Sequence, residues 1–382
     1  MILRTATNTI ATLASTFKVL ALTGPRQSGK TTLLRNFFHQ KQYVSLENPD
    51  EKAFALQDPR GFLRQFPDGA ILDEVQRTPE LFSYLQQIVD EDPRKCTFVL
   101  SGSNNFLLQQ SISQSLAGRV GYLELLPFDL AESELAAPKT TNEHLFLGGY
   151  PSIIYEKSDP NLWFSAYIRT YIERDVRQLK NINDLALFQK FLYLCAGRVG
   201  QQINLSQLGN ETGLDHKTVA AWLSILEASY VIHFVQPYYK NFNKRITKTP
   251  KLYFTDTGLC AFLLGIKKTE DLNYHSYRGA LFENLVINEL LKNRFNNAQR
   301  SNLYYFRDSS GYEIDVIIDD GTELKAIEIK SGATVSGDYF KNLHFWEKLT
   351  GYSDCTVLYD GDKTAVQHGG FMVKNWKAVK NL

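Results

Sequence analysis

The sequence has few cysteines, no long apolar run and almost no net charge, and each of these absences excludes a class of protein. Its four cysteines are far apart and form neither a disulfide framework nor a CxxC metal pair: Cys96, Cys195, Cys260 and Cys355. We expect buried, reduced thiols in the cytoplasm. No apolar run approaches the roughly 18 residues of a membrane span, and scattered Thr and Ser near the amino terminus argue against a signal peptide. The sequence therefore predicts neither a membrane partner nor export.

The composition is that of an ordinary globular protein. Of the 382 residues, 43% are hydrophobic and 22% are charged, and the formal net charge is +1. A chain of this length exceeds one ordinary core, so we expect three domains and a helical linker. The low net charge gives no general attraction to nucleic acid, so DNA binding would require a local basic patch.

From residue 17 to about 125, short β-rich runs alternate with helical apolar spacing. The runs are FKVLALT, YVSL, GAILDE, CTFVLSGS and GYLELL, and residues 31–38 and 80–89 have the helical spacing. This alternation predicts an α/β domain with a parallel sheet covered by helices.

A phosphate-binding loop follows the first of these strands. Residues 24–31, GPRQSGKT, fit GxxxxGK[ST] and open a predicted helix. Gly24 and Gly29 allow the backbone to wrap around phosphate. We expect Lys30 to reach the β- and γ-phosphates of ATP, and the Thr31 hydroxyl to bind Mg²⁺. The remaining residues expected to line the nucleotide are Pro25, Arg26, Gln27, Ser28 and Thr32. The alternative is a glycine turn that caps a helix.

An acidic pair ends the strand AILDE. Asp73 is expected to hold Mg²⁺ directly or through water, and Glu74 to polarise the attacking water. A helix cap is the alternative, but a P-loop requires a carboxylate of this kind on a neighbouring strand.

Further polar candidates follow the next strands. Ser101, Ser103 and Asn104 end CTFVLSGSN, where they could sense the γ-phosphate or orient water, and a simple turn is the alternative. Arg119 has the fixed charge needed to stabilise transferred phosphate, in cis or from a neighbouring subunit. A structural salt bridge is its alternative role.

The middle of the chain has the order of a winged helix-turn-helix. A helix from about residue 188 precedes residues 206–212, a helix over 215–228, and two strands joined by a basic loop. The basic loop residues, expected to meet a phosphate backbone, are Lys240, Lys244, Arg245, Lys248 and Lys251. His216, Lys217 and Thr218 open the second helix and are expected to meet a groove. Binding of a protein, or plain solvation of a charged hairpin, are the alternatives.

The C-terminal part places a second set of polar residues on a helix and two strands. Glu283 lies on a predicted helix and Asp315 within a strand, whereas Glu328 and Lys330 share one face of the next strand because alternate residues point the same way. Ordinary charged strand ends are the alternative.

These motifs resemble a large prokaryotic family of predicted AAA-type ATPases with a C-terminal domain of unknown function. The resemblance rests on GPRQSGKTTLL, LDEVQ, SGSN, LAGR, YIRTYIERDV, GLDHKTVAAWLSILEASYVI, EIDVII and IEIKSG. It implies an ATPase domain, a winged-helix middle and an end similar to the PD-(D/E)xK nuclease fold. In that fold, residues in the positions of Asp315 and Glu328 bind divalent metal, Lys330 would position or activate water, and Glu283 would assist. Ile314 stands where the proline of that motif is expected.

We therefore expect an α/β protein with a P-loop (AAA-like) domain at 1–135, a helical lid at 136–187, a winged helix at 188–272 and a nuclease-like α/β domain at 273–382. The first hypothesis is an ATPase that uses ATP and Mg²⁺ to act on DNA through the later domains. The rival is an ATP-controlled switch or scaffold that binds a protein partner, with an inactive nuclease fold as the docking surface, and an oligomer is possible. A nucleotide kinase is weaker, because only Arg169 and Arg174 suggest lid arginines.

Overall fold

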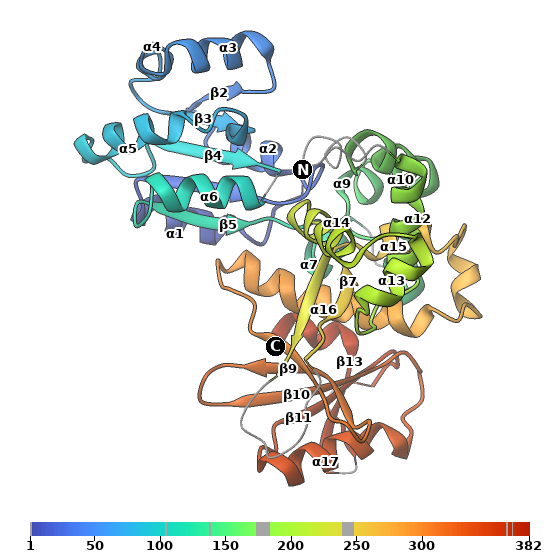
Figure 1. The fold of residues 1–382 in the computed structure, drawn as a ribbon. Coiled ribbons are helices and arrows are strands. Elements are labelled where there is room, and N and C mark those ends of the chain that lie inside the picture. The colour runs from blue at the N-terminus through green and yellow to red at the C-terminus, as the bar shows by residue number, and fades with distance from the viewer. Residues whose placement is uncertain are drawn as a thin grey trace. The chain divides into compact units, whose positions relative to one another are not determined.

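The chain folds into two compact units. The structure is a computed structural model, which describes residues 2–103, 105–136, 139–172, 184–238, 248–363, 366–368 and 370–382. The N-terminal unit comprises Met1–Glu132 with the short segments Ala228–Tyr230 and Arg294–Gln299. The C-terminal unit comprises Ser133–Glu227, Val231–Asn293 and Arg300–Leu382 (Figure 1). No described helix is both long and apolar enough to cross a membrane.

The N-terminal unit is built on a parallel sheet of five strands in the order β2-β3-β4-β1-β5. The strands are β1 Val19–Thr23, β2 Gln42–Ser45, β3 Ala70–Asp73, β4 Phe98–Gly102 and β5 Val120–Glu124. Each overlaps a run that the sequence predicts as β, and β2 and β5 begin one residue earlier. The parallel sheet is therefore confirmed. β4 lies between β1 and β3, which corrects the expectation that the acidic pair stands on a strand next to the P-loop strand.

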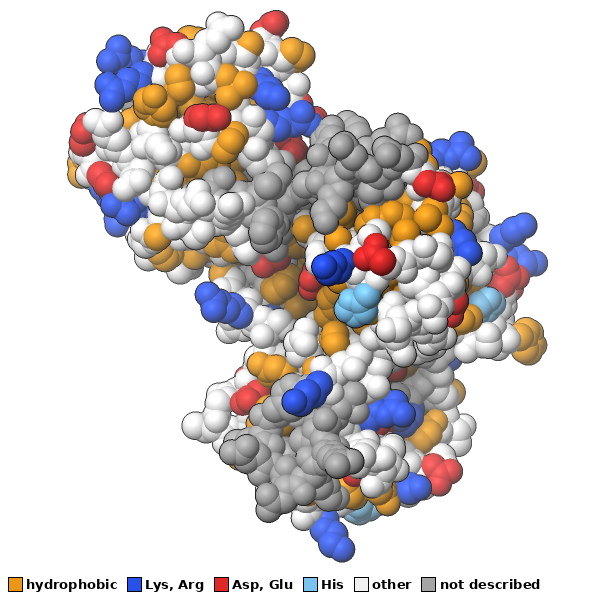
Figure 2. Space-filling view, viewed as in Figure 1, with side chains coloured by type: hydrophobic (Ala, Val, Ile, Leu, Met, Phe, Trp, Pro, Cys, Tyr) orange, Lys and Arg blue, Asp and Glu red, His pale blue; other side chains and the backbone are white. Residues whose placement is uncertain are grey.

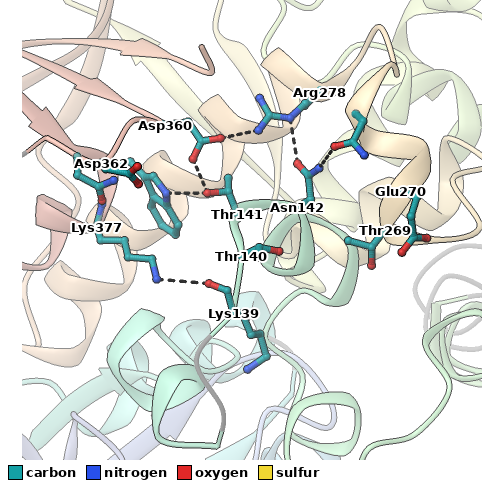
Figure 3. A pocket seen from close by; sticks show the side chains of 13 residues that line it. Lys139, Thr140, Thr141, Asn142, Thr269, Glu270, Arg278, Asp360, Asp362 and Lys377 are labelled. Atoms are coloured by element: carbon teal, nitrogen blue, oxygen red, sulfur yellow. Dashed lines mark hydrogen bonds and ion pairs between the residues drawn. The ribbon is translucent and has the colours of Figure 1, made fainter. Parts of the chain in front are cut away.

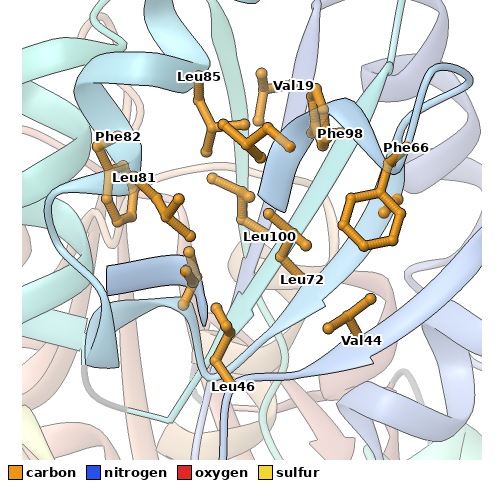
Figure 4. Packing of buried hydrophobic residues seen from close by; sticks show 14 of the residues in the cluster. Val19, Val44, Leu46, Phe66, Leu72, Leu81, Phe82, Leu85, Phe98 and Leu100 are labelled. Carbon is orange, nitrogen blue, oxygen red and sulfur yellow. The ribbon is translucent and has the colours of Figure 1, made fainter. Parts of the chain in front are cut away.

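Helices cover both faces of this sheet, and the two faces form separate cores. They are α1 Thr7–Thr16, α2 Lys30–Phe37, α3 Pro49–Gln57, α4 Pro59–Arg64, the 3₁₀ turn η1 Val75–Arg77, α5 Leu81–Glu91 and α6 Asn105–Ser115. Val19 and Ala21 of β1 pack in one cluster with residues of α3 to α6 (Figure 4). Leu20 and Leu22 pack in the other with α1 and α2. Because both faces are buried, the strands are apolar throughout rather than alternating.

The chain then passes through short helices to the C-terminal unit. They are α7 Leu130–Ala136, α8 Thr141–Leu147, α9 Pro151–Ile154, α10 Pro160–Tyr167 and the π-helical turn η2 Ile168–Ile172. A linker is expected around 136–142, but α8 begins within it, because Thr140 and Glu143 form a capping box. The helix expected over 162–178 starts at Pro160, and its end, with Arg174, lies outside the described residues.

The rest of the C-terminal unit mixes helices and strands. The helices are α12 Leu185–Ala196, α13 Leu205–Thr212, α14 His216–Ala228, α15 Thr257–Leu263, α16 Arg278–Asn296 and α17 Lys341–Thr350, with 3₁₀ turns η3 Thr269–Asn273, η4 Gly337–Phe340 and η5 Trp376–Asn381. The strands are β6 Ile232–Pro237, β7 Lys251–Phe254, β8 Leu303–Arg307, β9 Glu313–Asp319, β10 Leu324–Lys330, β11 Cys355–Tyr359, β12 Val366–His368 and β13 Phe371–Asn375.

One sheet of eight strands joins the middle of the chain to its end. Its order is β12-β13-β11-β10-β9-β8-β6-β7. β6 and β7 form an antiparallel hairpin after α14, as the sequence predicts, and Gln202 pairs with Lys251. β6 also pairs with β8, at Gln236 and Pro237, so the hairpin extends the sheet of the C-terminal strands. The winged-helix and nuclease-like assignments, and the bounds of the four predicted segments, stay predictions.

The state of the cysteines and the distribution of surface charge match what the composition predicts. All four cysteines are free and buried, as expected. On the face shown in Figure 2, basic and acidic side chains are interspersed among the described residues. Of the predicted wing, Lys240, Lys244 and Arg245 lie outside the described residues, and Lys248 is exposed.

Candidate functional sites

The backbone of residues 24–31 has the conformation that its glycines were expected to supply. The loop joins the carboxyl end of β1 to α2. Gly24 and Gly29 have φ of 144° and 91°, in the region that favours glycine. A Cβ on Gly24 would lie 2.1 Å from the carbonyl oxygen of Leu125. Any other residue at Gly24 would therefore displace the loop from β5.

Lys30 is folded into this loop. Its side chain is buried, and its Nζ donates to the carbonyl oxygens of Gly24 (2.8 Å) and Pro25 (2.7 Å). Burial lowers the pKa of Lys30 to about 8, although Glu74 and Asp73 raise it in part. A phosphate group in the loop would replace two neutral acceptors with charged ones, which favours the ammonium form.

A buried arginine outside the motif supports the loop. Arg4 donates from Nη1 to the carbonyl oxygen of Ser28 (2.7 Å) and from Nη2 to that of Leu126 (2.7 Å). Its Nε pairs with Glu132 at 2.9 Å. Sequence reasoning missed Arg4, because nothing local to the amino terminus points to residues so distant in the chain.

Asp73 and Thr31 meet at the edge of the sheet, as the magnesium prediction requires. The Thr31 hydroxyl donates to Asp73 Oδ2 at 2.9 Å, and the hydroxyl of Tyr43 donates to the same oxygen at 2.7 Å. Ser101, which lies opposite Asp73 on β4, donates to Oδ1. A hydroxyl and a carboxylate in contact are oxygen ligands of the kind that Mg²⁺ prefers, so these residues fit that ion. Tyr43 was missed, since a tyrosine in a short strand carries no local signal of this contact.

Glu74 is held in a strained conformation beside this pair. Its φ is 56°, in the left-handed region, which costs a residue with a Cβ of order 1 kcal/mol or more. Its Oε2 accepts from Gln76 Nε2 (2.5 Å) and from the Ser103 hydroxyl (3.0 Å). Its Oε1 lies 3.9 Å from Arg26 Nη1. Ser103 is thus brought to the site, whereas Asn104 lies outside the described residues.

The other loop residues differ in exposure. Arg26 also pairs with Glu47 at 3.3 Å. Gln27 is exposed with φ of 64°, and Ser28 is fully buried. Thr32 is exposed on α2. The loop therefore brings one arginine, Arg26, next to Glu74.

Arg119 is not brought to the loop of its own chain. It precedes β5, at the amino end of a strand parallel to β1, whereas the P-loop follows the carboxyl end of β1. Five strand residues separate these edges by roughly 16 Å. Arg119 instead forms a two-pronged pair with Asp90 on α5, at 2.5 and 2.8 Å. The cis role is therefore wrong on geometry, and a role from a neighbouring subunit stays a prediction.

The second set of polar residues also converges. The Asp315 and Glu328 carboxyl groups lie on adjacent antiparallel strands, one step beyond the pair Val316 and Ile327. Asp315 Oδ2 accepts from the backbone N–H of Ile329 at 2.7 Å and lies 3.6 Å from Lys330 Nζ. Lys330 also donates to Glu328 Oε2.

Two buried carboxyl groups lie close together in this site, and their pKa values shift in opposite directions. Burial and the neighbouring Asp315 raise the pKa of Glu328 well above its usual range. Burial also acts to raise the pKa of Asp315, but Lys330 and Lys251 outweigh it and lower that pKa. Glu328 is 1% exposed and its carboxyl group interacts with that of Asp315, but no N–H or hydroxyl group of the described residues donates to its Oε1. This oxygen fits a divalent cation, which would remove the conflict between the acids.

Glu283 approaches these acids but is held by residues that the sequence assigned elsewhere. Lys251 Nζ lies 3.1 Å from Glu283 Oε1 and 2.5 Å from Glu313 Oε1. The Tyr253 hydroxyl donates to the same Glu283 oxygen at 2.5 Å. Lys251 is 2% exposed, so its assignment to a DNA-binding patch is wrong. The signal was present: Lys251 and Tyr253 alternate in a short apolar strand and so share one face.

Hydrogen bonds of Arg278 connect the first turn of α16 to the end of β10, next to this site. Arg278, the first residue of α16, donates to the Ser331 carbonyl oxygen (2.6 Å), to Asp360 (2.5 Å) and to Asn142 (2.9 Å). Arg278, Asp360 and Asn142 also line a polar cavity of about 590 Å³ (Figure 3). Because Ser331 follows Lys330, Arg278 ties the helix that carries Glu283 to the end of β10.

Comparison with protein families divides the chain into three matched regions. Residues 16–134 match an AAA domain, residues 138–270 a domain of unknown function (DUF8612), and residues 278–379 another domain of unknown function (DUF4143). The N-terminal unit is thus a P-loop domain of the AAA type.

Two relatives match most of the chain. They are the uncharacterized proteins Mb2031c of Mycobacterium bovis and Rv2008c of Mycobacterium tuberculosis, each 32% identical over 323 residues, which is 83% of this chain and 71% of theirs. Among solved structures, the Walker-type ATPase paby2304 of Pyrococcus abyssi is 16% identical, with a TM-score of 0.47 over 68% of this chain and 94% of its own. AMPPCP-bound DnaA of Aquifex aeolicus is 14% identical, with a TM-score of 0.28 over 58% of this chain and 85% of its own. Both TM-scores are below 0.5.

Proposed function

The chain belongs to the family that includes these two mycobacterial proteins, with an AAA domain ahead of two domains of unknown function, and we propose that it hydrolyses ATP in the N-terminal unit. One observation carries the proposal. The Thr31 hydroxyl and the Asp73 carboxylate are in contact beside Lys30 and its loop, and Glu74 lies next along the chain from Asp73. A phosphate cradle, a magnesium-binding pair and a candidate base therefore occupy one edge of the sheet.

Each of these residues has a separable task. Lys30 and the backbone N–H groups of the loop would bind the phosphates, while Thr31 and Asp73 would hold Mg²⁺, which when bound would offset the phosphate charge. Glu74 accepts a proton from the attacking water. Ser103 and Gln76 orient Glu74 through its Oε2, so they act as positioning residues.

Separate measurements of binding and turnover test this assignment. Glu74→Gln should bind ATP as the unchanged protein does but hydrolyse it roughly 100-fold more slowly or worse, because general bases contribute about 10²–10⁴-fold. Lys30→Met should weaken ATP binding about tenfold or more, since a charge-assisted hydrogen bond is worth about 1.5–3 kcal/mol. Lys95→Met, at an exposed lysine outside the site, is the matched control. Unchanged ATP affinity in Lys30→Met would refute the site.

The second site supports a metal-dependent phosphodiester cleavage, as a second candidate function. The observation that favours it is the contact of Asp315, Glu328 and Lys330, with the buried Glu328 Oε1 accepting from no N–H or hydroxyl group of the described residues. Asp315 and Glu328 would hold a divalent ion, which when bound makes a water molecule more acidic. Lys330 would offset the charge that develops on the phosphate. DNA is the substrate proposed, because the exposed His216 and Lys217 open α14 in the predicted winged helix.

Plasmid cleavage distinguishes this function from its rival. With Mn²⁺ and ATP, cleavage of supercoiled DNA should disappear in Asp315→Asn and in Lys330→Met, whereas ATP hydrolysis should persist in both. Glu323→Gln, an exposed acid before β10, is a matched control. Absence of Asp315-dependent cleavage on any DNA form would favour the rival, an ATP-controlled switch that docks a protein partner through an inactive fold.

A further inference from the structure

Lys251 reaches the second site from the hairpin strand β7, not from the C-terminal strands. β7 lies at the edge of the eight-stranded sheet, and its residues 251 and 253 share a face. Tyr305 of β8 lies next to the ammonium, with Lys251 Nζ 5.3 Å from the ring centroid. Because the Lys251 ammonium is buried and lies next to the Tyr305 ring, we expect it to keep this position in the site.

The partners of Lys251 are the two acids that flank Asp315 and Glu328. Glu283 Oε1 is shared by the Lys251 ammonium and the Tyr253 hydroxyl, as described above. Glu313 pairs with Lys251 through Oε1 and with Arg307 through Oε2 at 3.0 Å. Both acids are thus paired with cations of the protein, and a metal ion at Glu283 would stand beside the ammonium of the buried Lys251. The ammonium beside Asp315 and Glu328 belongs to Lys330, whose side chain is 28% exposed and is therefore less confined than that of Lys251.

We propose that Lys251 restricts this site to one divalent cation, bound by Asp315 and Glu328, and that Glu283 positions Lys251 rather than binding metal. This inference rests on the second candidate function. In the described part of the chain, no three His, Cys, Asp or Glu side chains are placed to hold one metal ion. Asp315 and Glu328 are therefore the two protein ligands that we propose for the ion, and oxygen atoms of water or substrate would complete its coordination.

Titration of the nucleotide-free protein with Mn²⁺ tests the inference. Bound Mn²⁺ is counted by electron paramagnetic resonance, and the signal of Asp315→Asn is subtracted to remove ions held elsewhere. We expect one Asp315-dependent ion in the unchanged protein and in Lys251→Arg, which keeps the charge. Lys251→Met, which removes the charge at similar length, should bind a second ion or bind Mn²⁺ at least tenfold more tightly. Adding Glu283→Gln to Lys251→Met should reverse that gain.

Glu283→Gln tests whether Glu283 binds the metal, even if Lys251→Met does not fold. Glu283→Gln keeps the shape of the side chain and should leave the Asp315-dependent Mn²⁺ affinity within about twofold. A tenfold loss in Glu283→Gln, or an unchanged ion count and affinity in folded Lys251→Met, would overturn the role of Lys251 alone. Absence of any Asp315-dependent ion in the unchanged protein would overturn the metal site itself.

Discussion

Replacing Lys30 by methionine should stabilise the nucleotide-free protein while it weakens ATP binding. Methionine keeps the length of the lysine stem but carries no charge. In the structure, the ammonium of Lys30 is buried among loop atoms, and burial lowers its pKa from 10.5 to about 8. The folded protein therefore holds the charged form at a cost, which ATP would recover.

The size of this cost follows from the pKa. Each pKa unit corresponds to about 1.36 kcal/mol, so the shift is worth roughly 3 kcal/mol below pH 8. The substitution also leaves the carbonyl oxygens of Gly24 and Pro25 without their donor, which costs about 1 kcal/mol or more. We expect Lys30→Met to be more stable than the unchanged protein by about 1–2 kcal/mol at pH 7.

The sign of the pH dependence gives a second measurement. Because the folded-state pKa is lowered, the unfolded chain binds more protons between about pH 8 and 10.5, and the stability of the unchanged protein rises with pH there. The advantage of Lys30→Met should therefore shrink as pH rises above 8. The difference in unfolding free energy between Lys30→Met and the unchanged protein, measured at pH 7 and at pH 9.5, tests this expectation.

The assay must report on the N-terminal unit alone. All four tryptophans, Trp163, Trp222, Trp346 and Trp376, lie in the C-terminal unit, so their fluorescence reports only that unit. Hydrogen exchange of peptides from β1 and β4 during a urea titration reports the other unit. A Lys30→Met protein that is less stable than the unchanged protein at pH 7, with equal exchange in the C-terminal unit, would refute the reasoning.

Three further predictions concern the N-terminal unit. Burial raises the pKa of Glu124 to about 7, so stability should fall by up to about 3 kcal/mol as pH rises from 4.5 to 7, and urea titrations of Glu124→Gln should lack this fall. Arg119→Ala should leave the urea midpoint of unfolding almost unchanged, because an exposed ion pair contributes little to stability; a loss of ATP turnover that depends on protein concentration would support a role from a neighbouring subunit, and Asp90→Ala is the matched control. Gly24→Ala should abolish ATP binding measured by calorimetry, because its Cβ would collide with Leu125; retained affinity would contradict the loop geometry.

The sequence predicted the parts of the fold whose signal is local. All five strands of the N-terminal sheet overlap predicted runs, most clearly β1, β3 and β4, which are buried throughout and lie within their runs. The P-loop was predicted for the same reason, since glycines, lysine and threonine stand in one short segment. The helices α3 and α4 were missed, although each starts with a signal that can be read: Asn48 before Pro49, and Asp58 before Pro59.

The contacts that complete the nucleotide site were beyond local reasoning. Arg4 supports the loop at Ser28, and Tyr43 binds Asp73 from another strand. Each contact depends on strand order, and β4 between β1 and β3 was itself not expected. Sequence patterns specify that a residue is apolar or charged, whereas the partner is set by packing of distant segments.

Lys251 shows where composition misleads and alternation would have helped. Several basic residues precede it in the chain, so counting charges placed it in the basic loop expected to meet a phosphate backbone. Yet it lies in KLYF, where Leu252 and Phe254 are fully buried. A charge that alternates with buried residues in a short strand faces either solvent or a compensating charge, because an isolated buried charge is too costly. Acids that could compensate the charge of Lys251 stand in EIDVII, where Glu313 and Asp315 alternate with apolar residues. When one apolar strand carries alternating basic residues and another carries alternating acidic residues, the two strands are therefore predicted to contribute to one site. This holds even when a predicted domain boundary separates them in the sequence.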